Sequence, residues 1–299
     1  MCIRDSPYGG FEDLQRNRIC AVGEPKSRLS EDALRILRTY RFMDQGLAGV
    51  WKPERGLSNA LRTTRSMLSK IAPERIWSEL KRILLGKNAS IILQRMADDG
   101  ILRQIFDSDW MLDDYRISKL DSVEGDDVLD RLVVLLRDVP SQMCETIART
   151  MKLSNQEKKT LLFRHSCLGH IPELLDSNLR IHQYVLGDWA QQHLRIESLF
   201  APMNHGSHSS DDIQQRISRN EGLNTSDNSK SLATGEWIMA QTNMHQGPKL
   251  GALKNWLHRE QIARNLTSLE QIETLLCTLS WHEDEFNHWP KLQFPSQTV

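Results

Sequence analysis

Apolar residues recur at every third or fourth position along most of this 299-residue chain, which is the spacing of amphipathic α-helices. The first such helix should have Ser30 as its N-cap, carry Glu31 and Asp32 in its first turn, where the helix dipole favours negative charge, and end at Gly46. Further patterns predict helices over residues 58–70, 73–85, 89–97, 126–137, 141–151, 155–165, 172–200, 248–264 and 268–289. The predicted fold class is therefore all-α, an elongated assembly of many helices.

Two segments depart from this helical pattern. Residues 18–22 form a short strand-like run that Gly23 ends, and the adjacent Gly9 and Gly10 favour a sharp turn before it. Residues 204–231 are rich in Ser, Asn, His and Asp, which is typical of a flexible linker, with a short helix over residues 211–219. We therefore expect a short β remnant near the N-terminus and a linker before the last helices.

Composition excludes several classes of protein. No apolar run approaches the roughly 18–20 residues that a membrane-spanning helix needs, so we expect no membrane partner. The five cysteines are widely spaced and odd in number, which argues against a disulfide framework and against a Cys-x-x-Cys metal site. This cysteine usage favours a reducing, cytoplasmic location.

The net charge of −1 hides an asymmetry along the chain. Residues 1–106 carry 19 Lys and Arg against 12 Asp and Glu, whereas the remainder carries 19 against 27. A basic half predicts an anionic partner, of which nucleic acid is the commonest. The charges by themselves are equally consistent with two solvated surfaces that differ by chance.

Residues 28–42 are the most informative segment. At 3.6 residues per turn, Glu31, Arg35 and Arg38 share one stripe of the predicted helix, with Asp32 beside Arg35. Without further context, the same residues are typical of an exposed helix with ion pairs between residues four apart. The chemistry of this segment therefore depends on what surrounds it in the chain.

Five motifs follow one another in the first third of the chain. They are Pro-Tyr-Gly-Gly-Phe-Glu-Asp-Leu (7–14), Ile-Cys-Ala-Val-Gly-Glu-Pro (19–25), Glu-Asp-Ala-Leu-Arg-Ile-Leu-Arg (31–38), Arg-Ile-Trp-Ser-Glu-Leu (75–80) and Asp-Gly-Ile-Leu (99–102). This ordered set resembles the bacterial class II CCA-adding tRNA nucleotidyltransferases and their poly(A) polymerase relatives, strongly over residues 7–106 and weakly beyond. The resemblance implies a remnant of a head domain and hinge (1–25), a neck (26–110), a helical body (111–203), a flexible linker (204–231) and a helical tail (232–299).

The resemblance also implies that Asp32 and Arg35 read the base of the incoming CTP or ATP, while Glu31 positions Arg35. Hydrogen bonding gives a physical reason, because a carboxylate only accepts and a guanidinium only donates. Cytosine and adenine both present an exocyclic amine donor beside a ring-nitrogen acceptor, whereas uracil and guanine present a carbonyl beside a ring N–H. A mismatched base would leave unpaired polar groups at about 1–3 kcal/mol each, so the pair should select C and A.

Other residues are expected to support this site. Gly9 and Gly10 resemble the family's hinge between head and neck, and a simple tight turn is the alternative. Arg75 and Glu79 should form an ion pair that braces the neck. Lys249, at the start of a predicted helix, is a candidate contact for an RNA phosphate. Neck support or RNA binding is also expected of Arg28, Arg38 and Arg41.

Nucleotidyl transfer requires carboxylates that hold metal ions, and the resemblance implies Mg²⁺ bound in a head domain upstream of Gly9. Only six residues precede Pro7, so we expect an N-terminally truncated chain that is inactive alone, with no catalytic residue and no metal ligand. Asp107-Ser108-Asp109 matches Asp-x-Asp but lies between predicted helices, where a capping loop is expected. His205 and His208 are too few for a metal site. The pairs at 113–114, 126–127 and 211–212 should be helix N-terminal charges.

The predicted function is that of a CCA-adding tRNA nucleotidyltransferase, whose partners are tRNA and the substrates CTP and ATP. Two alternatives stay open. The first is a poly(A) polymerase relative, although such enzymes often carry a basic C-terminal extension and this C-terminal part is acidic. The second is a non-catalytic helical RNA-binding protein.

Overall fold

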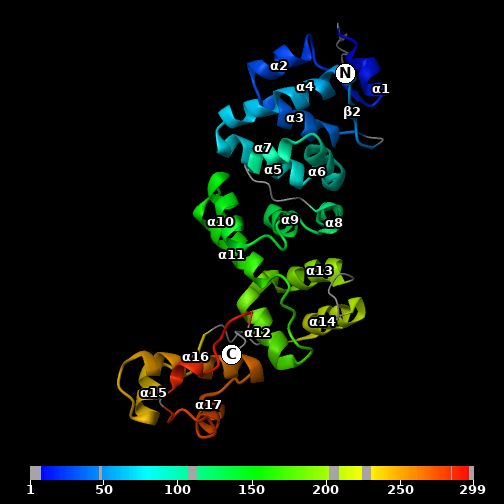
Figure 1. Cartoon of the computed structure of the whole chain (residues 1–299). Helices are drawn as coiled ribbons and strands as arrows, with labels where there is room; N and C mark the ends of the chain where they lie inside the picture. Colours follow the sequence, from blue (N-terminus) through cyan, green and yellow to red (C-terminus); the bar gives the residue numbers. More distant parts are fainter. Residues whose placement is uncertain are drawn as a thin grey trace, which may run out of the picture. The chain divides into compact units, whose positions relative to one another are not determined.

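The computed structural model describes residues 8–46, 49–106, 113–201, 209–223, 230–283 and 285–295 (Figure 1). The chain divides into two compact units, of which unit 1 ends at Ser166 and unit 2 begins at Cys167. Both units are built from helices, so the predicted all-α fold class is confirmed. No helix in the described ranges is long and apolar enough to cross a membrane.

Unit 1 begins with two very short strands among its helices. Strand β1 (Arg18–Ile19) pairs in parallel with β2 (Lys52–Pro53), so the predicted strand over residues 18–22 forms only in its first two residues. The helices of this unit are α1 (Gly10–Gln15), α2 (Pro25–Glu31), α3 (Leu34–Met43), α4 (Arg55–Thr64), α5 (Pro73–Leu84), α6 (Ala89–Asp98), α7 (Ile101–Phe106), α8 (Asp114–Lys119), α9 (Val128–Leu135), α10 (Ser141–Thr150) and α11 (Asn155–Cys167), with 3₁₀ turns η1 (Arg65–Lys70) and η2 (Leu120–Ser122).

The prediction that Ser30 begins a helix is wrong, because Ser30 lies inside α2. Helix α2 begins earlier, since Pro25 occupies its first turn and the Glu24 carboxylate accepts hydrogen bonds from the Lys26 and Ser27 N–H groups. The backbone then becomes extended at Asp32 (φ −148°, ψ 101°), and the Asp32 carboxylate accepts a hydrogen bond from the Leu34 N–H at 3.1 Å. The chain therefore breaks between α2 and α3 within the Glu-Asp-x-x-Arg motif.

Helix α3 is held in unit 1 by its apolar face and by one buried hydroxyl. Ile36, Leu37 and Tyr40 are fully buried. The Tyr40 hydroxyl donates to the Asp99 carboxylate at 2.8 Å, and Arg95 lies 2.7 Å from the same carboxylate oxygen. Burial, together with the neighbouring Asp99 charge, raises the pKa of Tyr40. The hydroxyl therefore stays protonated and fixes the orientation of α3.

Unit 2 corrects two of the predicted helices. The helix expected over residues 172–200 is divided into α12 (Asp176–Leu186) and α13 (Ala190–Phe200) by the 3₁₀ turn η3 (Gly187–Trp189). Gly187 adopts φ 56° and ψ −136°, a conformation that residues with a side chain rarely adopt. The helix expected to end at residue 289 is α17 (Leu269–Leu276), after which the chain turns and buries Trp289 in the core of the tail. The remaining elements are α14 (Ser210–Gly222), α15 (Gly235–Thr242), α16 (Pro248–Arg264) and η5 (Phe286–His288).

The predicted short helix within residues 204–231 is confirmed as α14, which begins with a capping box between Ser209 and Asp212. The rest of the predicted linker lies largely outside the described residues, as do His205 and His208. The domain boundaries that the resemblance implies stay a prediction.

Unit 2 also contains a buried polar chain on α12 and α13. His182, His193 and Glu197 are all 0 % exposed. His193 Nε2 lies 3.0 Å from the Cys167 carbonyl oxygen, which only accepts, so this nitrogen carries the proton. His193 Nδ1 lies 3.0 Å from His182 Nε2, and His182 Nδ1 is left without a hydrogen-bond partner among the described residues. Burial, with a smaller contribution from His193, lowers the pKa of His182 to about 3.

We expect unit 2 to lose stability in mild acid because of His182. An unfolded histidine binds a proton near pH 6.5, whereas folded His182 stays neutral down to about pH 3. The stabilisation is complete above pH 6.5 and falls as the pH drops towards 3, by roughly 1 kcal/mol per pH unit. Urea unfolding of the wild type and of His182→Gln over this range measures the difference in slope.

His245→Gln is the matched control, because His245 is exposed. This variant should keep the wild-type dependence of unfolding free energy on pH. A His182→Gln variant with the same pH dependence as the wild type would contradict the assignment.

Candidate functional site

A pocket of about 430 Å³ opens in unit 1 between α2, α3, α5 and the segment that follows β1. We call it the arginine pocket, because five arginines and one carboxylate supply its charged lining: Arg28, Arg35, Arg38, Arg41, Arg82 and Glu79. Its apolar lining includes Ile19, Ala21, Val22, Leu29, Phe42 and Leu57. The volume lies within the range of roughly 300–1,000 Å³ that is usual for small-molecule sites.

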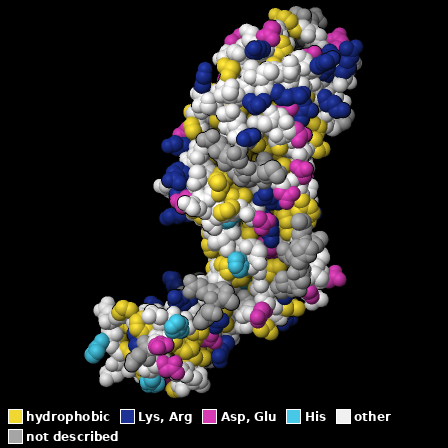
Figure 2. Space-filling model, in the orientation of Figure 1, with side chains coloured by type: hydrophobic (Ala, Val, Ile, Leu, Met, Phe, Trp, Pro, Cys, Tyr) yellow, Lys and Arg dark blue, Asp and Glu magenta, His cyan; other side chains and the backbone are white. Residues whose placement is uncertain are grey.

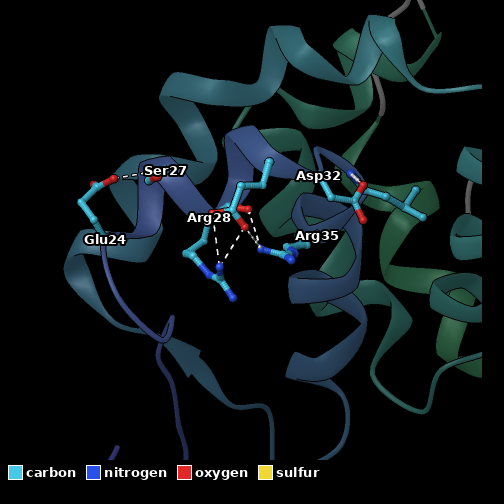
Figure 3. A network of polar contacts seen from close by, with 7 residues as sticks. Glu24, Ser27, Arg28, Asp32 and Arg35 are labelled. Atoms are coloured by element: carbon cyan, nitrogen blue, oxygen red, sulfur yellow. Dashed lines mark hydrogen bonds and ion pairs between the residues drawn. The ribbon is translucent and has the colours of Figure 1, made fainter.

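At one end of the arginine pocket, Arg28 and Arg35 (Figure 3) share the carboxylate of Glu31. The Glu31 carboxylate accepts hydrogen bonds from Arg28 at 2.9 Å and from Arg35 at 3.0 Å. Arg35 Nη1 also donates to the backbone carbonyl of Arg28 at 2.9 Å. The expected contact between Glu31 and Arg35 is therefore present, and it crosses the break between α2 and α3.

The sequence predicts that Asp32 lies beside Arg35 on one continuous helix, but the Asp32 side chain has a different position in the structure. Figure 3 shows the Asp32 side chain apart from the contacts of Arg28 and Arg35, and its carboxylate caps the start of α3. The same carboxylate lies 3.9 Å from Arg75 Nη2. Arg35 reaches Asp32 only through its backbone N–H, at 3.0 Å from the Asp32 carbonyl oxygen. Asp32 is not among the residues that line the arginine pocket. The reason is the extended backbone at Asp32, which turns its side chain towards α5.

The predicted ion pair between Arg75 and Glu79 is wrong. Glu79 is only 4 % exposed and lies 3.2 Å from Arg38 Nε and 3.3 Å from Arg41 Nε, both on α3. A buried carboxylate is costly without cations around it, and two guanidinium groups of α3 meet this need better than the exposed Arg75. The expected support role of Arg38 and Arg41 thus has a structural basis, in which α3 is joined to α5.

The other predicted residues lie outside the arginine pocket. Gly9 has a left-handed conformation (φ 71°) at the N-cap of α1, and Gly10 is the first residue of that helix. Lys249 lies near the start of α16, where its amine is 3.4 Å from the His282 carbonyl oxygen and 6.0 Å from the centre of the Trp289 ring. The hinge and RNA-contact roles of these residues stay predictions.

The acidic pairs that the structure describes behave as expected at helix starts. Asp113 caps α8 and Asp127 caps α9 through hydrogen bonds to backbone N–H groups, and Asp212 belongs to the capping box of α14. Asp107-Ser108-Asp109 lies outside the described residues. In the described part of the chain, no group of three or more His, Cys, Asp or Glu could hold a metal ion.

Sequence reasoning missed two residues of the arginine pocket, Arg82 and Phe42. Arg82 follows Glu79 by three residues on α5, and Phe42 follows Arg35 by seven on α3. Both spacings place the residues on the same helix face as those already singled out. The helical periodicity of the sequence could therefore have identified both residues.

Comparison with known proteins agrees with the motifs. Residues 52–108 match a family model described as "Probable RNA and SrmB- binding site of polymerase A". The CCA-adding enzyme of Lactococcus lactis subsp. cremoris (strain MG1363) is 26 % identical over 274 residues, which are 90 % of this chain and 63 % of that protein. The mitochondrial CCA tRNA nucleotidyltransferase 1 of Danio rerio is 30 % identical over 161 residues, which are 52 % of this chain and 36 % of that protein.

The fold is similar to that in the crystal structure of the Bacillus stearothermophilus CCA-adding enzyme in complex with CTP. The TM-score is 0.71 at 19 % identity, and the match covers 92 % of this chain and 68 % of that chain.

This chain is therefore similar in sequence to CCA-adding enzymes over most of its length, and it shares their fold.

The chain spans only part of the length of these relatives, 36 % of the Danio rerio protein and 63 % of the Lactococcus lactis protein. A second solved structure, the Thermotoga maritima CCA-adding enzyme complexed with tRNA_CCA, is similar with a TM-score of 0.51 at 17 % identity. That match covers 91 % of this chain and 66 % of that chain.

We expect Glu79→Gln to lower the free energy of unfolding of unit 1 by about 1–3 kcal/mol. The neutral amide would leave Arg41 half-buried beside it without an opposite charge. Urea unfolding followed by circular dichroism measures the loss. Glu31→Gln is the control, since its exposed ion pairs should contribute under about 1 kcal/mol. Equal losses in the two variants would contradict the central role of Glu79.

Proposed function

We propose that this chain selects the nucleotide and binds the RNA in a CCA-adding tRNA nucleotidyltransferase, with tRNA, CTP and ATP as its partners. The observation that carries the proposal is Arg35, held by Glu31 at one end of the arginine pocket and three residues after Asp32 (Figure 3). The names of the relatives support the substrate class, since they are CCA-adding enzymes, one solved with CTP and one with tRNA.

The side chains keep the hydrogen-bonding groups that base selection requires. Arg35 uses only Nη1 in its contacts, so Nε and Nη2 have no hydrogen-bond partner among the described residues. One Asp32 oxygen accepts from Leu34, and within the described ranges the other has no hydrogen-bond partner. We place the incoming base at the start of α3, where Asp32 would accept from its exocyclic amine and Arg35 would donate to its ring nitrogen.

RNA binding is supported by the surface of unit 1. Figure 2 shows Lys and Arg side chains gathered on the upper part of this face of the molecule, where Figure 1 labels α2 to α7 of unit 1. The segment that matches the RNA-binding family model exposes Arg55, Arg65, Lys70 and Lys87. Guanidinium and ammonium groups on such a surface bind phosphates with little sequence preference.

Mg²⁺ belongs to the proposed reaction, but the described residues do not fit a magnesium site, because they contain no suitable group of ligands. We therefore assign no metal-dependent step to them. We propose a cytoplasmic location, because Cys20, Cys144, Cys167 and Cys277 are free thiols, which persist in reducing compartments.

A poly(A) polymerase relative is the second candidate, favoured by the printed description of the family model that matches residues 52–108. The two functions differ in the use of CTP. A CCA-adding enzyme incorporates CTP before ATP, whereas a poly(A) polymerase extends RNA with ATP alone.

This prediction concerns the chain with a catalytic head domain joined in front of Pro7. In that protein, Asp32→Ala should lower kcat/KM for CTP and ATP. It should also reduce the preference for these nucleotides over UTP and GTP, because the carboxylate that disfavours a carbonyl group on the base is gone. Arg35→Ala should weaken both correct nucleotides by about 1–3 kcal/mol for each buried hydrogen bond lost. Steady-state kinetics with all four nucleotides measure both effects.

Arg38→Ala is the control for this series, since its guanidinium pairs with Glu79 rather than with the proposed base. The Arg38→Ala variant should keep the preference of the unmodified protein for CTP and ATP over UTP and GTP. If Asp32→Ala and Arg35→Ala fold normally and retain full discrimination, α3 has only a structural role.

We further expect the 299-residue chain to bind tRNA with a strong dependence on salt, because Lys and Arg would displace counterions from phosphates. Affinity should fall steeply as the salt concentration rises and should vary little with tRNA sequence. Fluorescence anisotropy with labelled tRNA over a series of salt concentrations measures the slope. An affinity independent of salt would refute phosphate binding by unit 1.

A further inference from the structure

The end of the arginine pocket far from Glu31 contains an exposed aromatic ring. Phe42 is 40 % exposed, although its helix neighbours Tyr40 and Met43 are buried in the core. The Arg41 guanidinium lies over the Phe42 ring, 4.8 Å from its centre. An aromatic side chain that lines a pocket and is partly open to solvent offers a flat surface for another planar group.

Arg82 on α5 lies towards the same end of the arginine pocket, because α5 runs beside α3 in the same direction, with Arg75 near Asp32 and Glu79 near Arg41. Glu79 is engaged by Arg38 and Arg41, and at the opposite end Arg28 and Arg35 share Glu31. Arg82 is exposed, and in the part of the chain that the structure describes it has no ion pair or hydrogen bond. Among the described residues, Arg82 is therefore the arginine of this pocket that has no carboxylate partner.

The spacing along α3 separates this end from the proposed site for the incoming base. Arg35 and Phe42 are seven residues apart, which is about 10 Å along a helix axis at 1.5 Å per residue. Both line the arginine pocket, so a ligand at Phe42 would lie beside a base at Arg35 rather than on top of it.

We propose that Phe42 and Arg82 form a subsite for a nucleotide at the single-stranded 3′ end of the RNA. The base stacks on Phe42 and its phosphodiester pairs with Arg82. A guanidinium matches a phosphate in charge and in its paired donors. Arg82 has no hydrogen-bond or ion-pair partner among the described residues, so its donors are available to a phosphodiester. This subsite rests on the proposed function, because that function supplies the RNA 3′ end.

The test uses the 299-residue chain and an RNA hairpin with a single-stranded 3′ tail. The last base of the tail is 2-aminopurine, and its fluorescence falls when it stacks on an aromatic ring. Phe42→Leu should weaken binding of the tailed hairpin by roughly 5- to 150-fold and restore fluorescence, since it removes the stacking surface but keeps an apolar side chain. Phe42→Tyr should behave as the wild type. Arg82→Ala should weaken the same binding and reduce the salt slope by about one.

Matched controls distinguish the loss of the proposed subsite from a general loss of RNA binding. Phe11→Leu makes the same change at an aromatic residue that is 60 % exposed and does not line the pocket, and it should leave binding unchanged. Arg149→Ala removes an exposed arginine of α10 outside the pocket and should not alter the quenching of the tail. A blunt hairpin without a tail should bind the wild type and the Phe42 variants equally.

Three outcomes would overturn the subsite. In the first, Phe42→Leu retains full quenching of the tail. In the second, the variants weaken tailed and blunt hairpins equally. In the third, they alter only the binding of free CTP or ATP, which would place the incoming nucleotide at Phe42. In these cases the proposed function still stands if the wild type binds tRNA, whereas a wild type that binds no RNA would contradict both.

Discussion

Two buried carboxylates fix helix α3, and the arginine pocket depends on the position of that helix. Glu79 on α5 holds Arg38 and Arg41, and Asp99 after α6 accepts the Tyr40 hydroxyl. A carboxylate in the interior stays charged only when cations and donors surround it. Each of the two groups is satisfied by one orientation of α3, so together they restrict the rotation of the helix that carries Arg35.

The same constraint gathers positive charge on one side of the arginine pocket. Glu79 draws guanidinium groups to the middle of α3, while Glu31 draws two more to its start, across the break at Asp32. The opposite lining comes from apolar residues after β1, such as Ala21 and Val22. A cavity that is cationic on one side and apolar on the other suits a nucleotide, whose phosphate is charged and whose base is flat and weakly polar.

Local signals predicted several elements well and failed where the backbone changes direction. Pro73 and Pro248 mark the starts of α5 and α16 correctly, because a proline in the first turn loses no helical hydrogen bond. Ser30 was misassigned as a cap because Pro25 and Glu24 already begin a helix upstream. The break at Gly187 was missed because apolar periodicity continues on both sides of it.

The sequence by itself determined the helical class, the order of the family motifs and the contact between Glu31 and Arg35, which are only four residues apart. The tertiary structure alone decided that Glu79 pairs with Arg38, 41 residues away, and that Asp32 faces Arg75. It also decided that Arg82 and Phe42 line the same pocket. The physical reason is that contacts within one or two turns follow from helical geometry, whereas contacts between α3 and α5 depend on how the two helices pack.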